Sequence, residues 1–179
     1  MPRAIDNEIK LDDNRYTVSR TDSLGVIEYA DDYFEEISGY SEAELIGRPH
    51  SIVRHPDMPK VVFKIMWEEI NKGENIKTII KNLAKDGSYY WVVADFESKI
   101  DPVTNKIVSH TAFERPIPKK AVKSITPIYQ KLLEIEKEHN LQASEDYLLV
   151  YLEKNNTTYD ELVEKLISKK SLFEHLLRL

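Results

Sequence analysis

Three β-type segments joined by two short turns constrain the fold of this chain more than any other feature. The segments are 77–84 (KTIIKNLA), 88–98 (SYYWVVADFES) and 107–114 (IVSHTAFE). They are rich in β-branched and aromatic residues, which favour strands. Gly87 in the first turn tolerates a positive φ, and DPVTNK at 101–106 contains the residue types typical of turns. We therefore expect two successive hairpins and an antiparallel sheet.

The region before these hairpins predicts two more strands and three helices. Phe34 and Ile37 share one helical face, and Gly39 ends that helix. Ser41 and Glu44 form a capping-box pattern at the start of the next helix. The expected strands are 16–22 and 26–30, and the expected helical segments are 31–40, 41–47 and 60–73. The order β-β-α-α-α-β-β-β indicates an α+β fold: a five-stranded antiparallel sheet with helices on one face.

Residues 119–179 show helical periodicity and no strand signal, so we expect an all-α C-terminal extension. In its first helix, Thr126 is the expected N-cap, followed by Pro127 at the first helical position. Segments 143–154 and 158–179 predict two further helices, the last one capped by Thr158 with Glu161 and carrying Leu172, Phe173, Leu176 and Leu177. Residues 1–14 are mostly polar and are expected to form an N-terminal cap or arm.

Composition excludes several classes of function. The net charge of −6 over 179 residues argues against a nucleic-acid partner. No run of about 18 apolar residues occurs, and the N-terminus lacks the apolar core of a signal peptide, so we expect a cytoplasmic protein without direct membrane insertion. The absence of cysteine excludes disulfides, thiolate-ligated zinc, iron–sulfur clusters and thiol catalysis.

One irregular segment, RPHSIVRHPDMPK at 48–60, concentrates polar chemistry. It holds two histidines, two arginines, an aspartate and three prolines. Proline stiffens a backbone, so these polar groups lose little freedom when they bind a ligand. The segment therefore holds many hydrogen-bonding groups on a stiff, irregular backbone.

Several spaced motifs resemble one family. RHPDMP at 54–59, MW at 66–67 and YYWV at 89–92 occur in an order similar to that of the flavin-binding PAS domain of the aerotaxis-receptor (energy taxis) family. The resemblance covers about residues 15–118, the expected PAS sensor domain, and is closest to short soluble FAD-binding PAS proteins of bipartite energy-taxis systems. It implies the PAS fold and a non-covalent FAD. It further implies that a membrane-bound methyl-accepting chemotaxis-type transducer is the partner.

The resemblance, taken together with side-chain chemistry, gives a set of expected FAD contacts. Arginine offers a planar fork of donors for a phosphate or a flavin carbonyl, and an asparagine amide matches the ring edge. Histidine and aspartate accept hydrogen bonds, and tryptophan supplies aromatic wall. The expected cofactor-binding residues are Arg54, His55, Asp57, Trp67, Asn82 and Trp91. The expected function is a redox sensor rather than an enzyme, and the C-terminal extension is its partner or homodimer surface, or a structural cap.

Other interpretations stay open on sequence alone. Arg54 with Asp57 fits a plain surface ion pair, and the tryptophans fit an ordinary core. A haem-based gas sensor would use a histidine such as His50 or His55 as axial ligand. A cofactor-free PAS interaction module is a further alternative, favoured by Ile76, which stands where the family often has tryptophan. A metal site at His50, His55 and Asp57 is disfavoured because the spacing matches no standard site.

Overall fold

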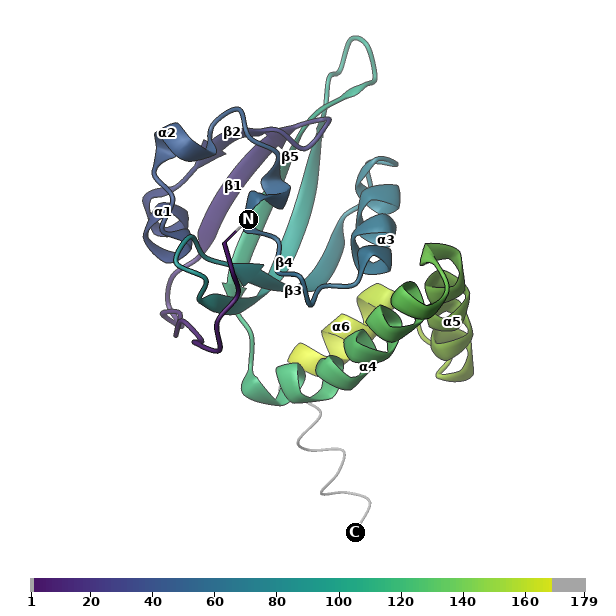
Figure 1. The fold of residues 1–179 in the computed structure, drawn as a ribbon. Helices are drawn as coiled ribbons and strands as arrows, with labels where there is room; N and C mark the ends of the chain where they lie inside the picture. Colours follow the sequence, from purple (N-terminus) through teal and green to yellow (C-terminus); the bar gives the residue numbers. More distant parts are fainter. Residues whose placement is uncertain (1, 169–179) are drawn as a thin grey trace.

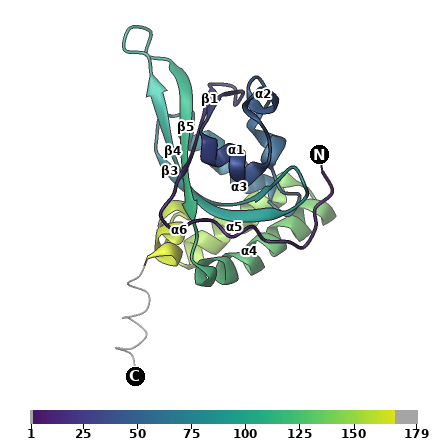
Figure 2. The same ribbon diagram turned by 90° about the vertical axis from the view of Figure 1, so that its left-hand side faces the viewer.

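The computed structural model describes residues 2–168 and contains one five-stranded antiparallel sheet (Figures 1 and 2). Its strand order is β2-β1-β5-β4-β3, and all neighbouring strands pair antiparallel. The strands are β1 (Thr17–Asp22), β2 (Ile27–Ala30), β3 (Ile76–Leu83), β4 (Tyr89–Ile100) and β5 (Ile107–Pro116). The expected α+β fold is confirmed. The two predicted hairpins, β3–β4 and β4–β5, are confirmed as well. The tip of the β4–β5 hairpin projects beyond the rest of the chain (Figure 1).

Short helices follow β2 and pack on one face of the sheet. They are α1 (Asp32–Ser38), α2 (Glu42–Leu45), the 3₁₀ helix η1 (His50–Val53) and α3 (Lys60–Ile70). Gly39 ends α1 with a φ of 71°, in the left-handed region that favours glycine, as the sequence predicts. The capping box of Ser41 and Glu44 is also present at the start of α2. Local chemistry therefore sets the end of α1 and the start of α2.

The N-terminal segment runs along the beginning of β4. The backbone N–H of Ile5 donates to the Gly87 carbonyl, and that of Ile9 donates to the Tyr89 carbonyl. Tyr89 in turn donates its N–H to the Asn7 carbonyl. These bonds cover backbone groups at the start of a sheet strand.

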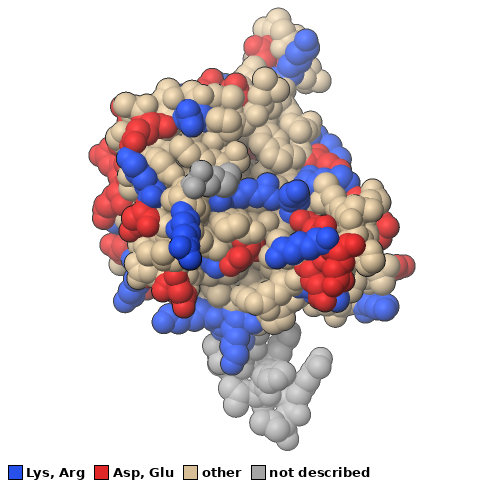
Figure 3. Space-filling view, in the orientation of Figure 1, with Lys and Arg blue, Asp and Glu red and all other residues tan. Residues whose placement is uncertain are grey.

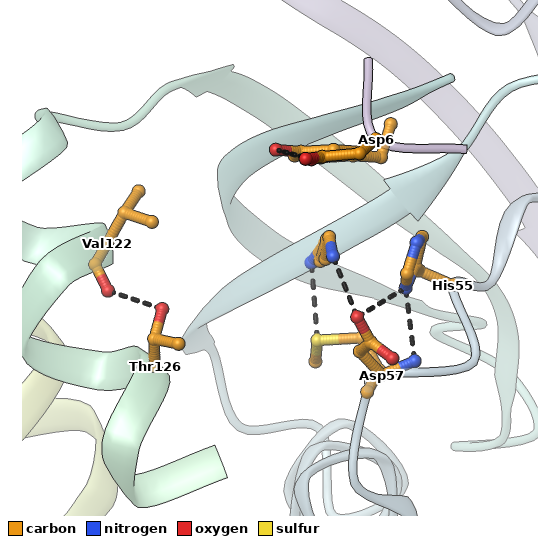
Figure 4. Close-up of polar contacts among 8 residues, drawn as sticks. Asp6, His55, Asp57, Val122 and Thr126 are labelled. Atoms are coloured by element: carbon orange, nitrogen blue, oxygen red, sulfur yellow. Dashed lines mark hydrogen bonds and ion pairs between the residues drawn. The ribbon is translucent and has the colours of Figure 1, made fainter. Parts of the chain in front are cut away.

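Three helices follow the sheet, and the first differs from the sequence prediction. They are α4 (Lys119–Glu138), α5 (Leu141–Lys154) and α6 (Tyr159–Ile167). The prediction that Thr126 caps a helix beginning at Pro127 is wrong, because both residues lie inside α4. The Thr126 hydroxyl donates to the Val122 carbonyl at 2.7 Å (Figure 4). Burial of Ala121 and Ile125 one turn apart stabilises the earlier turns and offsets the cost of an internal proline.

Side-chain caps set the N-terminal starts of α5 and α6. Helix α5 begins two residues before the predicted segment because the Asn140 side chain accepts from the Ala143 N–H. The predicted capping box of Thr158 and Glu161 is confirmed at α6. The apolar residues predicted for the end of this helix, Leu172, Phe173, Leu176 and Leu177, lie outside the described residues. No helix of the described part is both long and apolar enough to cross a bilayer.

Helices α4 and α6 cover the face of β3 and β4 that points away from α3. The Tyr129 hydroxyl donates to the Ile79 carbonyl at 2.7 Å and lies 2.6 Å from the Tyr159 hydroxyl. On α6, the Asp160 carboxylate accepts from the Lys77 N–H at 2.7 Å. Ile79 and Val93 of the sheet belong to one buried cluster with apolar residues of α3 and of the three C-terminal helices. The sheet is therefore buried on both faces where β3 and β4 run.

Carboxylates from the C-terminal helices hold α3 at two points. Pro59, the N-cap of α3, provides no side-chain cap. Instead, Glu136 of α4 accepts from the N–H groups of Lys60 and Val61 at 3.0 and 2.9 Å. Glu145 of α5 forms an ion pair with Lys64. Carboxylates stabilise a helix N-terminus because its first N–H groups lack intrahelical partners.

We expect Glu136→Ala to lower the free energy of unfolding by about 1 kcal/mol, the usual cost of losing a helix cap. Denaturant unfolding of both proteins measures the difference. The matched control is Glu134→Ala on the same helix, where Glu134 pairs with the exposed Lys131. Equal stability of the two variants would mean that Glu136 does not cap α3.

Candidate functional site

A cavity of about 410 Å³ lies between α3 and the sheet. Phe63, Met66 and Trp67 of α3 form one wall. Ile80 and Ala112 on the strands form part of the facing floor. This volume falls within the range of small-molecule and cofactor sites, which are mainly apolar with a few polar groups.

Polar side chains from three strands line the floor of the cavity: Ser19, Thr21, Asn82, His110 and Glu114. Strand register brings them together. Ser19 pairs with Ala112, and Thr21 pairs with His110 across β1 and β5. Because alternate residues of a strand face the same side, His110, Ala112 and Glu114 all point to the cavity. The floor thus has the small side chain of Ala112 between the polar side chains of His110 and Glu114.

Glu114 is a carboxyl group buried in this floor, with only 2% of its surface exposed. The Thr17 hydroxyl donates to it at 3.1 Å, and the Asn82 amide nitrogen lies 3.4 Å away. Burial raises the pKa of Glu114 to about 7, because removal from water disfavours the charged form. The nearby Tyr90 hydroxyl is buried and has no hydrogen-bond partner within the described residues. On the floor itself, Nε2 of His110 is also buried without a partner among the described residues, so the floor offers unused hydrogen-bonding capacity.

Three cationic side chains line the cavity beside α3: Arg54, Lys60 and Lys64. The guanidinium carbon of Arg54 lies 4.1 Å from the centroid of the Phe63 ring. Arg54 also forms an isolated β-bridge with Asn82, which ties the loop after η1 to β3. Burial lowers the pKa of Arg54, yet a guanidinium stays charged in proteins. This side of the cavity is therefore suited to an anionic group.

His50 of η1 also lines the cavity, and its ring is neutral at neutral pH. Its Nε2 is 2.9 Å from the Ser19 hydroxyl oxygen, and its ring centroid is 5.7 Å from that of Phe34. Burial lowers the pKa of His50 to about 4. Among the described residues, no group of three or more potential metal-ligating side chains comes together.

The structure brings three of the six sequence-predicted residues to the cavity: Arg54, Trp67 and Asn82. His55 and Asp57 are not among the lining residues. The Asp57 N–H donates to Nδ1 of His55 at 3.0 Å, and the Asp57 carboxylate pairs with Lys81 at 2.8 Å (Figure 4). The first of these contacts joins neighbours within the loop, and the second ties the loop to β3. A cofactor contact of these two residues stays a prediction.

Trp91 lies on the opposite face of the sheet. Its ring stacks on Tyr129 of α4, with centroids 6.4 Å apart and an interplanar angle of 26°. The neighbouring Tyr90 and Val92 point to the other face, because side chains alternate along β4. Trp91 thus packs the C-terminal helices onto the sheet, and its predicted cofactor contact has no support from this arrangement.

Sequence reasoning missed His110 and Glu114 as cavity residues. Both were inside the strand predicted at 107–114, four residues apart and hence on one face. A polar residue at a buried strand position is informative, because buried polar groups need partners. That signal was available once β5 was expected to have a buried face.

Comparison with known proteins agrees with this architecture. The family described as the PAS fold matches residues 27–105. The aerotaxis receptor of Escherichia coli is 35% identical over 131 residues, which cover 73% of this chain. This chain therefore has a PAS fold, and over these 131 residues it is similar to an aerotaxis receptor. It spans only 26% of the length of that receptor.

Solved structures support the same fold for the PAS domain. The light-state LOV domain of the blue-light photoreceptor Aureochrome1 has a TM-score of 0.54 and 22% identity, covering 68% of this chain and 91% of its own. A LOV domain studied with a flavin analogue has a TM-score of 0.53 and 20% identity, covering 62% of this chain and 82% of its own. At these identities the likeness establishes the fold alone.

We expect stability to fall as pH rises through the interval from about 4.5 to about 7, because of Glu114. Its pKa in the folded PAS domain is above the ordinary value of 4.5, so within this interval the native state holds a proton that the unfolded state has lost. Glu114→Gln removes this dependence, and the variant should gain about 3 kcal/mol relative to the parent between pH 5 and pH 8. Denaturant unfolding at both pH values measures the gain.

The control for this experiment is Glu97→Gln, an exposed position on β4. It should leave the difference between the two pH values as it is in the parent. If Glu114→Gln and Glu97→Gln behave alike, Glu114 does not bind a proton on folding.

Proposed function

We propose that this protein is a redox sensor that binds FAD non-covalently in the cavity and signals by protein–protein contact. The observation that carries the proposal is the composition of the cavity walls. Aromatic and aliphatic side chains face each other across it, polar groups line its floor, and cations line it beside α3. A planar, amide-edged ring joined to a diphosphate has these same three kinds of surface. The relationship to an aerotaxis receptor supports this choice.

Particular residues fit particular parts of FAD. Phe63 and Trp67 offer flat apolar surface to the isoalloxazine ring. Asn82 offers both a donor and an acceptor to an amide-like ring edge. Arg54 and Lys60 offer positive charge to the diphosphate. Bound FAD would supply reversible electron exchange. The chain has no cysteine, which excludes the cysteinyl photo-adduct chemistry of light sensing.

Helix α3 offers a route from the cavity to the C-terminal helices. One side of α3 lines the cavity, while its N-terminus and Lys64 contact Glu136 and Glu145. A shift of α3 between redox states would change these contacts. The proposed output is binding to a methyl-accepting chemotaxis-type transducer through the extension at 119–179, with residues 15–118 as the sensor and 1–14 as an arm. Acidic and basic side chains are interspersed over the face drawn in Figure 3.

The visible absorption spectrum of the freshly purified protein, followed by release of any chromophore, tests the cofactor. Flavin bands that bleach on reduction, with FAD as the released compound, are the expected result. A Soret band would replace this proposal by haem-based sensing. A colourless protein that also fails to take up added FAD would leave a cofactor-free interaction module.

We expect Arg54→Ala to weaken FAD binding about tenfold, the usual effect of losing a hydrogen bond to a charged group. The same substitution should weaken the binding of riboflavin much less, because riboflavin lacks the diphosphate. Fluorescence titration of the apoprotein with each compound measures both. The matched control is Arg20→Ala, because Arg20 also lies near an aromatic ring but pairs with Glu28 on the exposed face of β1. Equal losses for FAD and riboflavin would show that Arg54 does not contact the diphosphate.

A further inference from the structure

His110 is a buried histidine on the cavity floor whose two ring nitrogens have different surroundings. Only 3% of its surface is exposed, and it lines the cavity from β5. Its Nδ1 lies 2.9 Å from the Ser98 hydroxyl oxygen on the neighbouring strand β4. Its Nε2 is buried without a hydrogen-bond partner in the part of the chain that the structure describes. These different surroundings determine which ring nitrogen donates a hydrogen bond and which one accepts.

The Ser98 hydroxyl determines the tautomer of His110. A hydroxyl has one proton, and Ser98 donates it to the Ile70 carbonyl at 2.9 Å. The Ser98 oxygen must therefore accept from Nδ1–H of His110. Burial lowers the pKa of His110, which keeps the ring neutral at neutral pH. Nε2 then carries a lone pair and no proton, so it is an acceptor only.

The ring of His110 is held firmly on its other side as well. Trp67 of α3 meets it edge to face, with ring centroids 5.5 Å apart at an angle of 87°. The lining residues nearby are mainly apolar, among them Ile70 and Phe96. A buried acceptor without a partner is unfavourable, so a group that enters the cavity with a donor would remove this cost and bind more tightly. Because the acceptor is already oriented, little freedom is lost on binding.

We propose that His110 is a specificity residue of the cavity, whose Nε2 accepts a hydrogen bond from an N–H or O–H of the bound flavin. This inference rests on the proposed function and extends it to a residue outside the polar segment at 48–60. The donor is either the imide N–H of the isoalloxazine ring or a hydroxyl of the ribityl chain. A ligand of the same shape without that donor would bind more weakly.

Two variants separate the acceptor from the ring. His110→Phe keeps an aromatic ring beside Trp67 but removes the acceptor, and His110→Gln keeps an acceptor without the ring. Titration of the apoproteins with FAD should show affinity about tenfold weaker for His110→Phe and within about threefold of the parent for His110→Gln. Thermal unfolding of each apoprotein checks that the fold is intact. Parent-like FAD affinity in His110→Phe would overturn the inference and leave the proposed function standing.

Titration with lumiflavin, which has the ring but no ribityl chain, identifies the donor. A loss in His110→Phe that persists with lumiflavin places the donor on the ring, and a loss confined to FAD and riboflavin places it on the chain. If the parent protein binds no flavin, the proposed function and this inference both fail. If haemin binds with a Soret band that disappears in His110→Phe, Nε2 is an iron ligand and the inference is overturned.

Nitrogen-15 NMR of histidine-labelled protein provides a readout independent of affinity. The apoprotein should show a protonated Nδ1 and an unprotonated Nε2 for His110, assigned by comparison with His110→Phe. Addition of FAD should shift the Nε2 resonance much more than that of Nδ1. A purely structural histidine would keep both resonances in place, and a protonated Nε2 in the apoprotein would contradict the inference directly.

Discussion

The alternation of side chains along β4 and β5 is the constraint on which the site depends. On β5, His110, Ala112 and Glu114 face the cavity, and Phe113 between them faces the other way. On β4, Tyr90 and Val92 pack toward α1, whereas Val93 packs toward α4 and α6. A slip of one residue in the pairing would reverse both sets at once. Because each face of β4 is covered by a different group of helices, burial on both faces fixes the register and thereby the floor of the cavity.

One buried polar atom without a partner among the described residues, Nε2 of His110, lies on this floor. Within the described residues, the buried side-chain atoms that lack a hydrogen bond are the Thr78 and Tyr90 hydroxyls and Nε2 of His110. Buried polar groups normally find partners, and each that does not lowers stability. Glu114 adds a buried carboxyl with a raised pKa. His110 and Glu114 are thus two departures from ordinary core composition on the cavity floor, and such departures are typical of a binding site.

Local patterns predicted most of the elements, whereas tertiary packing decided the residues that the sequence placed wrongly or left open. Gly39 and the boxes at Ser41 and Thr158 act within one helical turn, so their effect is visible in the sequence. Pro127 misled because burial of Ile125 outweighs a local rule. In the hexapeptide at 54–59, Arg54 lies over Phe63 of α3 and Asp57 pairs with Lys81 of β3, so both directions depend on residues outside the hexapeptide. In contrast, the alternation of side chains along β5 would have been enough to predict that His110 faces the cavity.

Helix α3 connects the cavity to the C-terminal helices. Its N-cap residue provides no side-chain cap, so a residue of α4 takes this role. The first N–H groups of α3 are satisfied by Glu136, so the position of its N-terminus depends on α4. Trp67, two turns later, contacts His110 in the cavity. A ligand can shift the C-terminal helices only to the extent that it binds two positions of α3 with different affinity. The same coupling acts in reverse, since a partner that draws Glu136 away from α3 would change the affinity of the cavity by an equal factor.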